Sequence, residues 1–311
     1  MFIPSEEELE EFLASRPNQG RWGPDDQVAA LNLLTPEKVS RAASLVRRGE
    51  RVSISRPLPV APTANNPTPF EHIVFAPPTQ GRTSTGVQTA LDYYGMAYHG
   101  QSFTHLDGLG HQWDQNGLWN GRDPAKHFTP NAITWGGIEH WQQGIVTRGV
   151  LLDVPRHRGV SSVTQDRPVH GDELAAIADA QGISIEPGDA VIVNCGREAW
   201  ERETGALYSS TTDDEGRPTR PGLHASCLWF LRDVDAAVLV WDMLDAKPFG
   251  YRSASVHAAI YSLGLAIIDN ANLESLAQRC AELGTYEFMF LTLPLAVVGG
   301  TGSPANPVAV F

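Results

Sequence analysis

Three histidines and one aspartate are crowded into the fourteen residues 98–111 of a chain that has ten histidines in all. In an extended segment, residues two apart point to the same side, so His105 and Asp107 can converge on one ion. Two glycines allow the backbone to turn after Asp107 and to bring His111 back toward the same point. The residues of this segment that could do chemistry are His99, His105, Asp107 and His111.

Imidazole and carboxylate groups without a thiolate suit Zn²⁺ or Mn²⁺ with open coordination positions, an arrangement that activates water. The alternative is that His105 and Asp107 form an ordinary hydrogen-bonded pair in a surface loop, because short motifs often match by accident. The local spacing alone therefore leaves both interpretations open.

A metal site needs further ligands, and the apolar stretch 256–276 contains His257 and Asp269. Asp269 follows an apolar run and is expected at the end of a strand, where polar groups need partners. The alternatives are a core histidine bonded to the backbone, and a helix cap supplied by Asp269 or Asn272 near Leu273. For Asn272, capping is the better interpretation.

The elements that must position these residues alternate between strands and helices. A helix is expected to begin with Thr35 as N-cap and Pro36 at its first position and to end at Gly49; residues 51–55 form a strand, and the proline-rich residues 56–70 an irregular loop. Further buried strands are predicted at 149–154, 189–195, 236–242 and 286–298, and helices at 172–182, 224–233 and 273–284. The pattern predicts a mixed α/β fold, with a central sheet or barrel-like β layer flanked by helices.

The composition indicates a soluble globular protein that is a poor partner for phosphate backbones. The chain has 311 residues, 42% of them hydrophobic, and a net charge of -13 that argues against binding to nucleic acid or to an anionic membrane. The acidic N-terminal segment and the lack of a long apolar run favour a cytoplasmic location without a membrane span. Three scattered cysteines are expected to be buried thiols.

The segment 101–111 resembles the signature of the metal-dependent cyclase family, which includes kynurenine formamidase, isatin hydrolase and trans-dienelactone hydrolase. The signature is His-x-Gly-Thr-His-x-Asp-x-Pro-x-His, and it matches here at Thr104, His105, Asp107 and His111. The first histidine of the signature is replaced by Gln101. Stretches such as "RWGPDDQVAALNLLTPEKV", "IVTRGVLLDVPRHRGV" and "GGTGSPANPVAV" extend the resemblance over nearly the whole chain.

The resemblance implies a swivelling β/β/α fold in one domain over residues 1–311, with a helical segment (1–50) packing on it, and a homodimer or homotetramer. It implies that His111 is the general acid/base, and that the metal ligands are His105, Asp107, His257 and Asp269. A neutral amide is a weaker donor than imidazole, so Gln101 is expected to be a weak extra ligand or a hydrogen-bond donor to bound water. We therefore predict one Zn²⁺ or Mn²⁺ ion per chain.

The chemistry of the histidine and aspartate side chains and the family resemblance together predict a hydrolase that opens a cyclic amide or a lactone through a metal-activated water. Two alternatives remain open: ring closure or isomerisation of a polyketide-like substrate, and a metal-binding homologue without catalysis. His99 and His224 could be structural or could face the site. Four aromatic residues could form pocket walls or simply pack in the core: Phe103, Trp113, Trp119 and Trp135.

Overall fold

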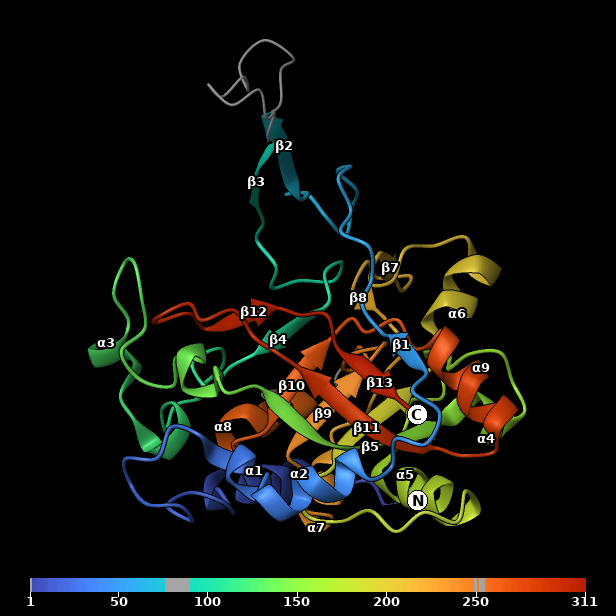
Figure 1. Cartoon of the computed structure of the whole chain (residues 1–311), viewed down its shortest axis with the longest axis horizontal. Helices are drawn as coiled ribbons and strands as arrows, with labels where there is room; N and C mark the ends of the chain where they lie inside the picture. The colour runs from blue at the N-terminus through green and yellow to red at the C-terminus, as the bar shows by residue number, and fades with distance from the viewer. Residues whose placement is uncertain (1, 76–89, 249–250, 252–254) are drawn as a thin grey trace, which may run out of the picture.

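The centre of the molecule is a nine-stranded sheet, seen in the computed structural model, which describes residues 2–75, 90–248, 251 and 255–311 (Figure 1). The predicted mixed α/β fold with flanking helices is confirmed. In spatial order the strands are β1 (Arg51–Ser53), β13 (Val308–Val310), β11 (Glu287–Thr292), β5 (Ile145–Asp153), β6 (Ala190–Asn194), β9 (Val238–Trp241), β10 (Ala266–Asp269), β4 (His105–Asp107) and β12 (Gly302–Pro304).

The four central strands β5, β6, β9 and β10 are parallel, whereas the remaining neighbours pair antiparallel. β6, β9 and β10 are buried along their whole length, which explains their continuous apolar runs. The antiparallel pairing of β10 with β4 sets Asp269 directly opposite His105. This register brings two segments together that lie more than 150 residues apart in the sequence.

Helices cover both faces of the sheet, and each face carries its own cluster of buried apolar side chains. Helices α1, α2, α5 and α7 lie below the sheet in Figure 1, and α9 and α4 lie toward its right-hand end. The α-helices are α1 (Glu6–Ser15), α2 (Pro36–Ala43), α3 (Pro124–His127), α4 (Val154–Arg158), α5 (Gly171–Ala180), α6 (Arg197–Thr204), α7 (Cys227–Asp233), α8 (Ala259–Leu263) and α9 (Glu274–Leu283). Within the described residues, none of the helices combines the length and the apolar character that crossing a membrane requires.

Within the described part of the chain, two small antiparallel pairs lie outside the main sheet. The hairpin of β2 (Glu71–Phe75) and β3 (Leu91–Gly95) projects from the body of the molecule, and β7 (Thr211–Thr212) pairs with β8 (Pro218–Thr219) (Figure 1). Short 3₁₀ helices complete the structure at η1 (Ala29–Leu33), η2 (Trp119–Gly121), η3 (Ile138–Trp141) and η4 (Val256–Ala258).

Most predicted elements are found, but two of them end well before the predicted boundary. The last apolar run forms a strand only as far as Thr292, because Pro294 cannot donate a hydrogen bond to a neighbouring strand. The first predicted helix has the expected N-cap, Thr35, but ends at Ala43 instead of Gly49. The Ser44 hydroxyl donates to the Arg41 carbonyl at 2.7 Å, a local bond that competes with continuation of a helix.

Candidate metal centre

The five predicted site residues other than Gln101 meet at the end of β4 and β10. His105 and Asp107 lie on β4, Asp269 is the last residue of β10, and His257 lies in η4. His111 comes back toward Asp107 through a turn in which its N–H donates to the Gly108 carbonyl at 3.0 Å. The glycine-assisted turn expected from the sequence is therefore present.

Asp107 lies at the middle of this group. His105 Nε2 is 3.3 Å from Asp107 Oδ1 and 3.8 Å from Asp269 Oδ2. His257 Nε2 is 3.1 Å from Asp269 Oδ2 and 3.9 Å from Asp107 Oδ2, and His111 Nε2 is 3.7 Å from Asp107 Oδ2. The side chain of Asp107 is fully buried, so three imidazoles surround a carboxylate that water does not reach.

His99, for which the sequence left a structural role and a place at the site both open, joins the same group. Its Nδ1 lies 2.9 Å from Asp107 Oδ1, and its ring stacks on that of His111 with 4.0 Å between centroids. Its Nε2 is hydrogen-bonded to the Thr301 hydroxyl at 3.1 Å, which fixes the ring. The only signal in the sequence was that His99 belongs to the same histidine-rich segment.

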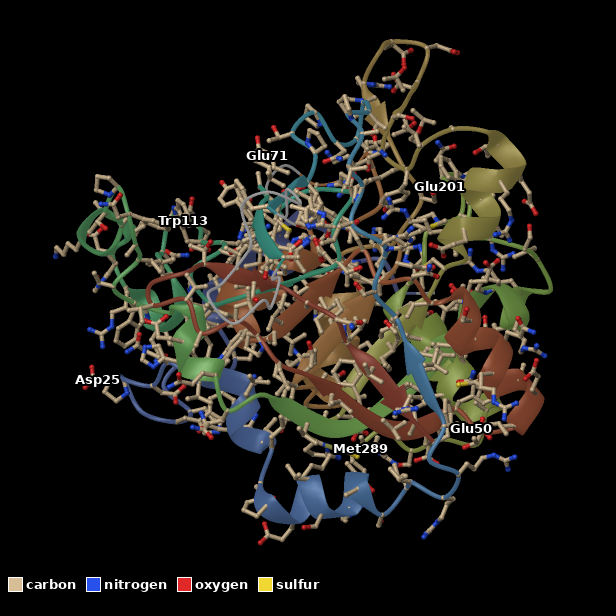
Figure 2. All side chains as sticks on the ribbon, turned by 45° about the horizontal axis from the view of Figure 1, so that its top comes forward. Asp25, Glu50, Glu71, Trp113, Glu201 and Met289 are labelled. Carbon is tan, nitrogen blue, oxygen red and sulfur yellow. The ribbon has the colours of Figure 1, made fainter. Side chains whose placement is uncertain are left out.

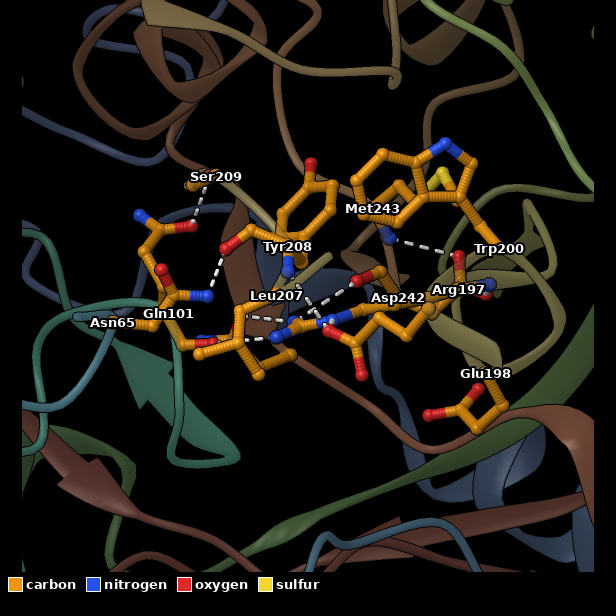
Figure 3. A network of polar contacts seen from close by, with 12 residues as sticks. Asn65, Gln101, Arg197, Glu198, Trp200, Leu207, Tyr208, Ser209, Asp242 and Met243 are labelled. Atoms are coloured by element: carbon orange, nitrogen blue, oxygen red, sulfur yellow. Dashed lines mark hydrogen bonds and ion pairs between the residues drawn. The ribbon is translucent and has the colours of Figure 1, made fainter. Parts of the chain in front are cut away.

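Gln101 faces another part of the molecule. Its Oε1 accepts hydrogen bonds from Ser209 Oγ and Arg220 Nη1, both at 3.2 Å. Figure 3 shows the Gln101 side chain turned toward Ser209. Among the described histidine, cysteine, aspartate and glutamate side chains, two groups have ligand atoms close enough to share a metal ion, and His257 belongs to neither: His99, Asp107 and His111, and His105, Asp107 and Asp269.

The donor set fits a divalent cation. Both carboxylate oxygens of Asp107 and the Nδ1 atom of His99 are buried without a well-oriented hydrogen bond from any described residue. A buried carboxylate without such hydrogen bonds destabilises the folded chain, and a cation bound beside it would neutralise its charge. Nitrogen and oxygen ligands without thiolate suit Zn²⁺ or Mn²⁺.

Hydrogen bonds behind the imidazoles fix the direction in which each ring nitrogen points. His105 Nδ1 donates to the Phe103 carbonyl at 2.9 Å, and His257 Nδ1 donates to Asp245 Oδ2 at 2.5 Å. In both rings this leaves Nε2 facing the carboxylates, as is usual for metal-binding histidines. Trp241 Nε1 donates to Asp269 Oδ1 at 2.5 Å and holds the second carboxylate. No motif in the sequence pointed to the roles of Asp245 and Trp241.

The carboxylates govern the charge of the histidines in the absence of metal. Burial would lower the pKa of His105, but Asp107 and Asp269 raise it to about 9. The pKa of His257 is also raised, because Asp245 and Asp269 outweigh burial. Burial lowers the pKa of His111 to about 4 despite the nearby Asp107, so this imidazole is neutral at pH 7. A cation would supply the positive charge that protons supply on His105 and His257.

Of the four aromatic residues considered as pocket walls, three are buried in the interior: Phe103, Trp119 and Trp135. Trp113 is 45% exposed, packs against Phe128 with ring centroids 4.8 Å apart, and lies near the edge of the molecule in Figure 2. His224 lies outside the centre, where its ring packs against that of His170. The three cysteines are buried free thiols, as expected.

Comparison with known proteins identifies a family for this chain. The Cyclase family model matches residues 52–247. A crystal structure of a novel cyclase is 28% identical in sequence and has a TM-score of 0.78, with 94% of this chain and 99% of that chain covered.

Two isatin hydrolases share the fold at lower identity. Isatin hydrolase A from Labrenzia aggregata has a TM-score of 0.57 at 20% identity, with 90% of this chain and 98% of that chain covered. The enzyme from Ralstonia solanacearum has a TM-score of 0.58 at 18% identity, with coverage of 89% and 98%. A search of curated protein sequences gave no significant match. With the family model spanning well over half of its residues, the chain belongs to the Cyclase family.

Proposed function

We propose that the chain is a metal-dependent hydrolase that opens a cyclic amide or a lactone. The observation that carries this proposal is the buried Asp107 carboxylate, whose two oxygens lack a well-oriented hydrogen bond from the described residues while four histidines and Asp269 surround it. The fold shared with isatin hydrolases, whose name denotes hydrolysis of a cyclic amide, supports the substrate class.

The ion, Zn²⁺ or Mn²⁺, would be held by His105, Asp107, His257 and Asp269. In this proposal His99 takes the place at the centre that the signature assigns to position 101, because its Nδ1 faces Asp107 whereas the Gln101 amide is bonded to Ser209 and Arg220. When bound, a divalent ion lowers the pKa of a water molecule and polarises a carbonyl.

His111 is the proposed general acid/base. Its pKa of about 4 in the metal-free chain makes it a neutral imidazole at pH 7, which is the form that accepts a proton. Its side chain is 23% exposed, whereas that of His105 is 1% exposed, so a substrate can reach it from solvent. His111 would take a proton from water at Nε2 and then donate it to the leaving nitrogen or oxygen of the opened ring.

A chelator experiment tests the proposal. Purified protein is assayed against a panel of cyclic amides and lactones, first as isolated, then after EDTA treatment and dialysis, then after addition of Mn²⁺ or Zn²⁺. We expect ring opening that disappears with EDTA and returns with one of the ions. Ring opening that persists in fully metal-free protein would contradict the metal-dependent mechanism, and metal binding without turnover on any substrate would contradict a hydrolase of this class.

A further inference from the structure

A largely buried network beside the candidate centre connects β10 with the segment that leads into β4. Its main member is Asn270, which directly follows Asp269 and is fully buried. Asn270 Nδ2 donates to the carbonyls of Gly100 at 2.7 Å and Phe103 at 3.0 Å, in the segment that leads into β4. In return, the Thr104 hydroxyl donates to the Asn270 carbonyl at 2.8 Å.

Arg197 determines which way the Asn270 amide points. This arginine, on α6, is 3% exposed, and its Nη1 donates to Asn270 Oδ1 at 2.8 Å while its Nη2 donates to the Gln101 carbonyl at 2.7 Å. A guanidinium has donors only, so the atom of Asn270 that faces it must be the oxygen. The amide nitrogen is therefore left to face the two carbonyls.

Arg197 is itself firmly held. Its Nε donates to Glu201 at 3.1 Å, and its guanidinium lies 4.4 Å from the centre of the Tyr208 ring. Its backbone N–H donates to the buried Asp242 carboxylate at 3.0 Å, which also accepts from the N–H groups of Cys195 and Gly196. Figure 3 shows Arg197 extended between Asp242 and the backbone of Gln101.

One atom links this network to the centre. The Phe103 carbonyl accepts hydrogen bonds both from Asn270 Nδ2 and from His105 Nδ1, at 3.0 and 2.9 Å. A displacement of that carbonyl would turn the His105 ring and move its Nε2 away from Asp107. Asn270 is also suited to its backbone conformation, since φ is +56° and asparagine tolerates this left-handed region better than most residues.

We propose that Asn270 and Arg197 are positioning residues, which set the affinity of the centre for its metal by aligning His105 with Asp107 and Asp269. The inference rests on the proposed metal site and goes beyond it, because neither side chain is among the proposed ligands. Groups that orient a ligand in this way are worth about 10- to 100-fold in metal affinity or activity.

The test uses Co²⁺ titration of the metal-free full chain, followed by visible absorption, with four proteins: parent, Asn270→Gly, Arg197→Gln and Arg158→Gln. Glycine keeps the left-handed backbone and removes only the side chain. Arg158 is the matched control, because it is equally buried, at 3% side-chain exposure, and pairs with Glu173 and with the carbonyls of Arg167 and Pro168.

We expect Asn270→Gly and Arg197→Gln to raise the Kd for Co²⁺ about 10- to 100-fold and to alter the absorption bands, which report ligand geometry. Arg158→Gln should lower the melting temperature of the metal-free protein but keep the Kd within about twofold of the parent. If Asn270→Gly does not fold, Arg197→Gln decides alone.

The outcomes separate the two proposals. A parent that binds Co²⁺ tightly, with an unchanged Kd and spectrum in both variants, would overturn the positioning role alone. An equal loss of affinity in Arg158→Gln would show a general effect of stability and would also overturn it. A parent that binds no Co²⁺ would overturn the metal site itself.

Discussion

The molecule gathers histidines at two places, and the two differ in the polar groups that lie beside the rings. At the candidate centre, the histidines face the carboxylates of Asp107 and Asp269. In the second place, which we call the His170–His224 pair, the rings are 4.3 Å apart and both Nδ1 atoms meet the Ser226 hydroxyl, at 3.2 and 3.0 Å.

The difference appears in the charge of His105 and His257, although not in that of His111, whose pKa is also lowered to about 4. The pKa of His105 is raised to about 9 by the carboxylates, against the effect of burial. The pKa of His224 is lowered to about 4 by burial and by the nearby His170, and that of His170 is lowered as well. The comparison teaches that buried negative charge, more than the number of histidines, makes a place able to hold a cation.

The largest expected effect concerns the residue that would do the proton transfer. His111→Asn should reduce kcat about 100- to 10,000-fold, because a general acid/base contributes that much, while the metal content stays at the parent level. His224→Asn is the matched control from the other pair and should leave both unchanged. Metal analysis beside steady-state kinetics gives the answer, and loss of the ion together with activity would make His111 a ligand instead.

The next largest effect concerns Asp245, the carboxylate that accepts a hydrogen bond from His257. Asp245→Asn puts an amide where His257 Nδ1 now donates, so the ring can lose its orientation and the Kd for Mn²⁺ should rise about 10- to 100-fold. Asp189→Asn is the control, since Asp189 is an equally buried carboxylate that pairs with Arg148 and Lys38. Isothermal titration with Mn²⁺ measures both variants; equal Kd values for the two would mean that Asp245 has no specific role.

The smallest effect concerns the His170–His224 pair and depends on pH. The pKa of His224 is about 4 in the folded chain, below its ordinary value of 6.5, so the unfolded state binds more protons between these values. The neutral His224 ring therefore contributes fully to the free energy of unfolding above pH 6.5. This contribution is lost as the pH falls toward 4.

His224→Gln removes this titration. Thermal melts of metal-free protein at pH 7 and pH 5 should show a Tm decrease about 2–4 °C smaller in the variant than in the parent. Equal decreases in both proteins would show that His224 does not titrate as its surroundings imply.

The central strands could be predicted because each contains a continuous apolar run. Asp269 was correctly expected at a strand end, because a charged residue that follows an apolar run is disfavoured inside a buried strand. The end of β11 could have been predicted from Pro294, whereas the end of α2 depends on a side-chain hydrogen bond that the sequence does not show.

The site was only partly predictable for a different reason. The proximity of His105, Asp107 and His111 follows from local spacing, whereas the contact of His257 with Asp245 depends on how the chain returns after β9. Motif alignment places position 101 at the centre, but the backbone turns the Gln101 side chain toward Arg220 and brings His99 to Asp107. Spacing along a sequence cannot show on which side of a loop a residue lies.

The central claim is that the buried Asp107 carboxylate, at the middle of the histidines, holds a divalent ion. The most direct measurement is the metal content of the parent and of Asp107→Asn, by mass spectrometry after equilibration with Mn²⁺ or Zn²⁺ and removal of free ion. The substitution keeps the shape of the side chain and removes its charge. We predict that the parent retains bound metal and that the variant retains almost none, although it folds; a variant with the same metal content as the parent would contradict the account.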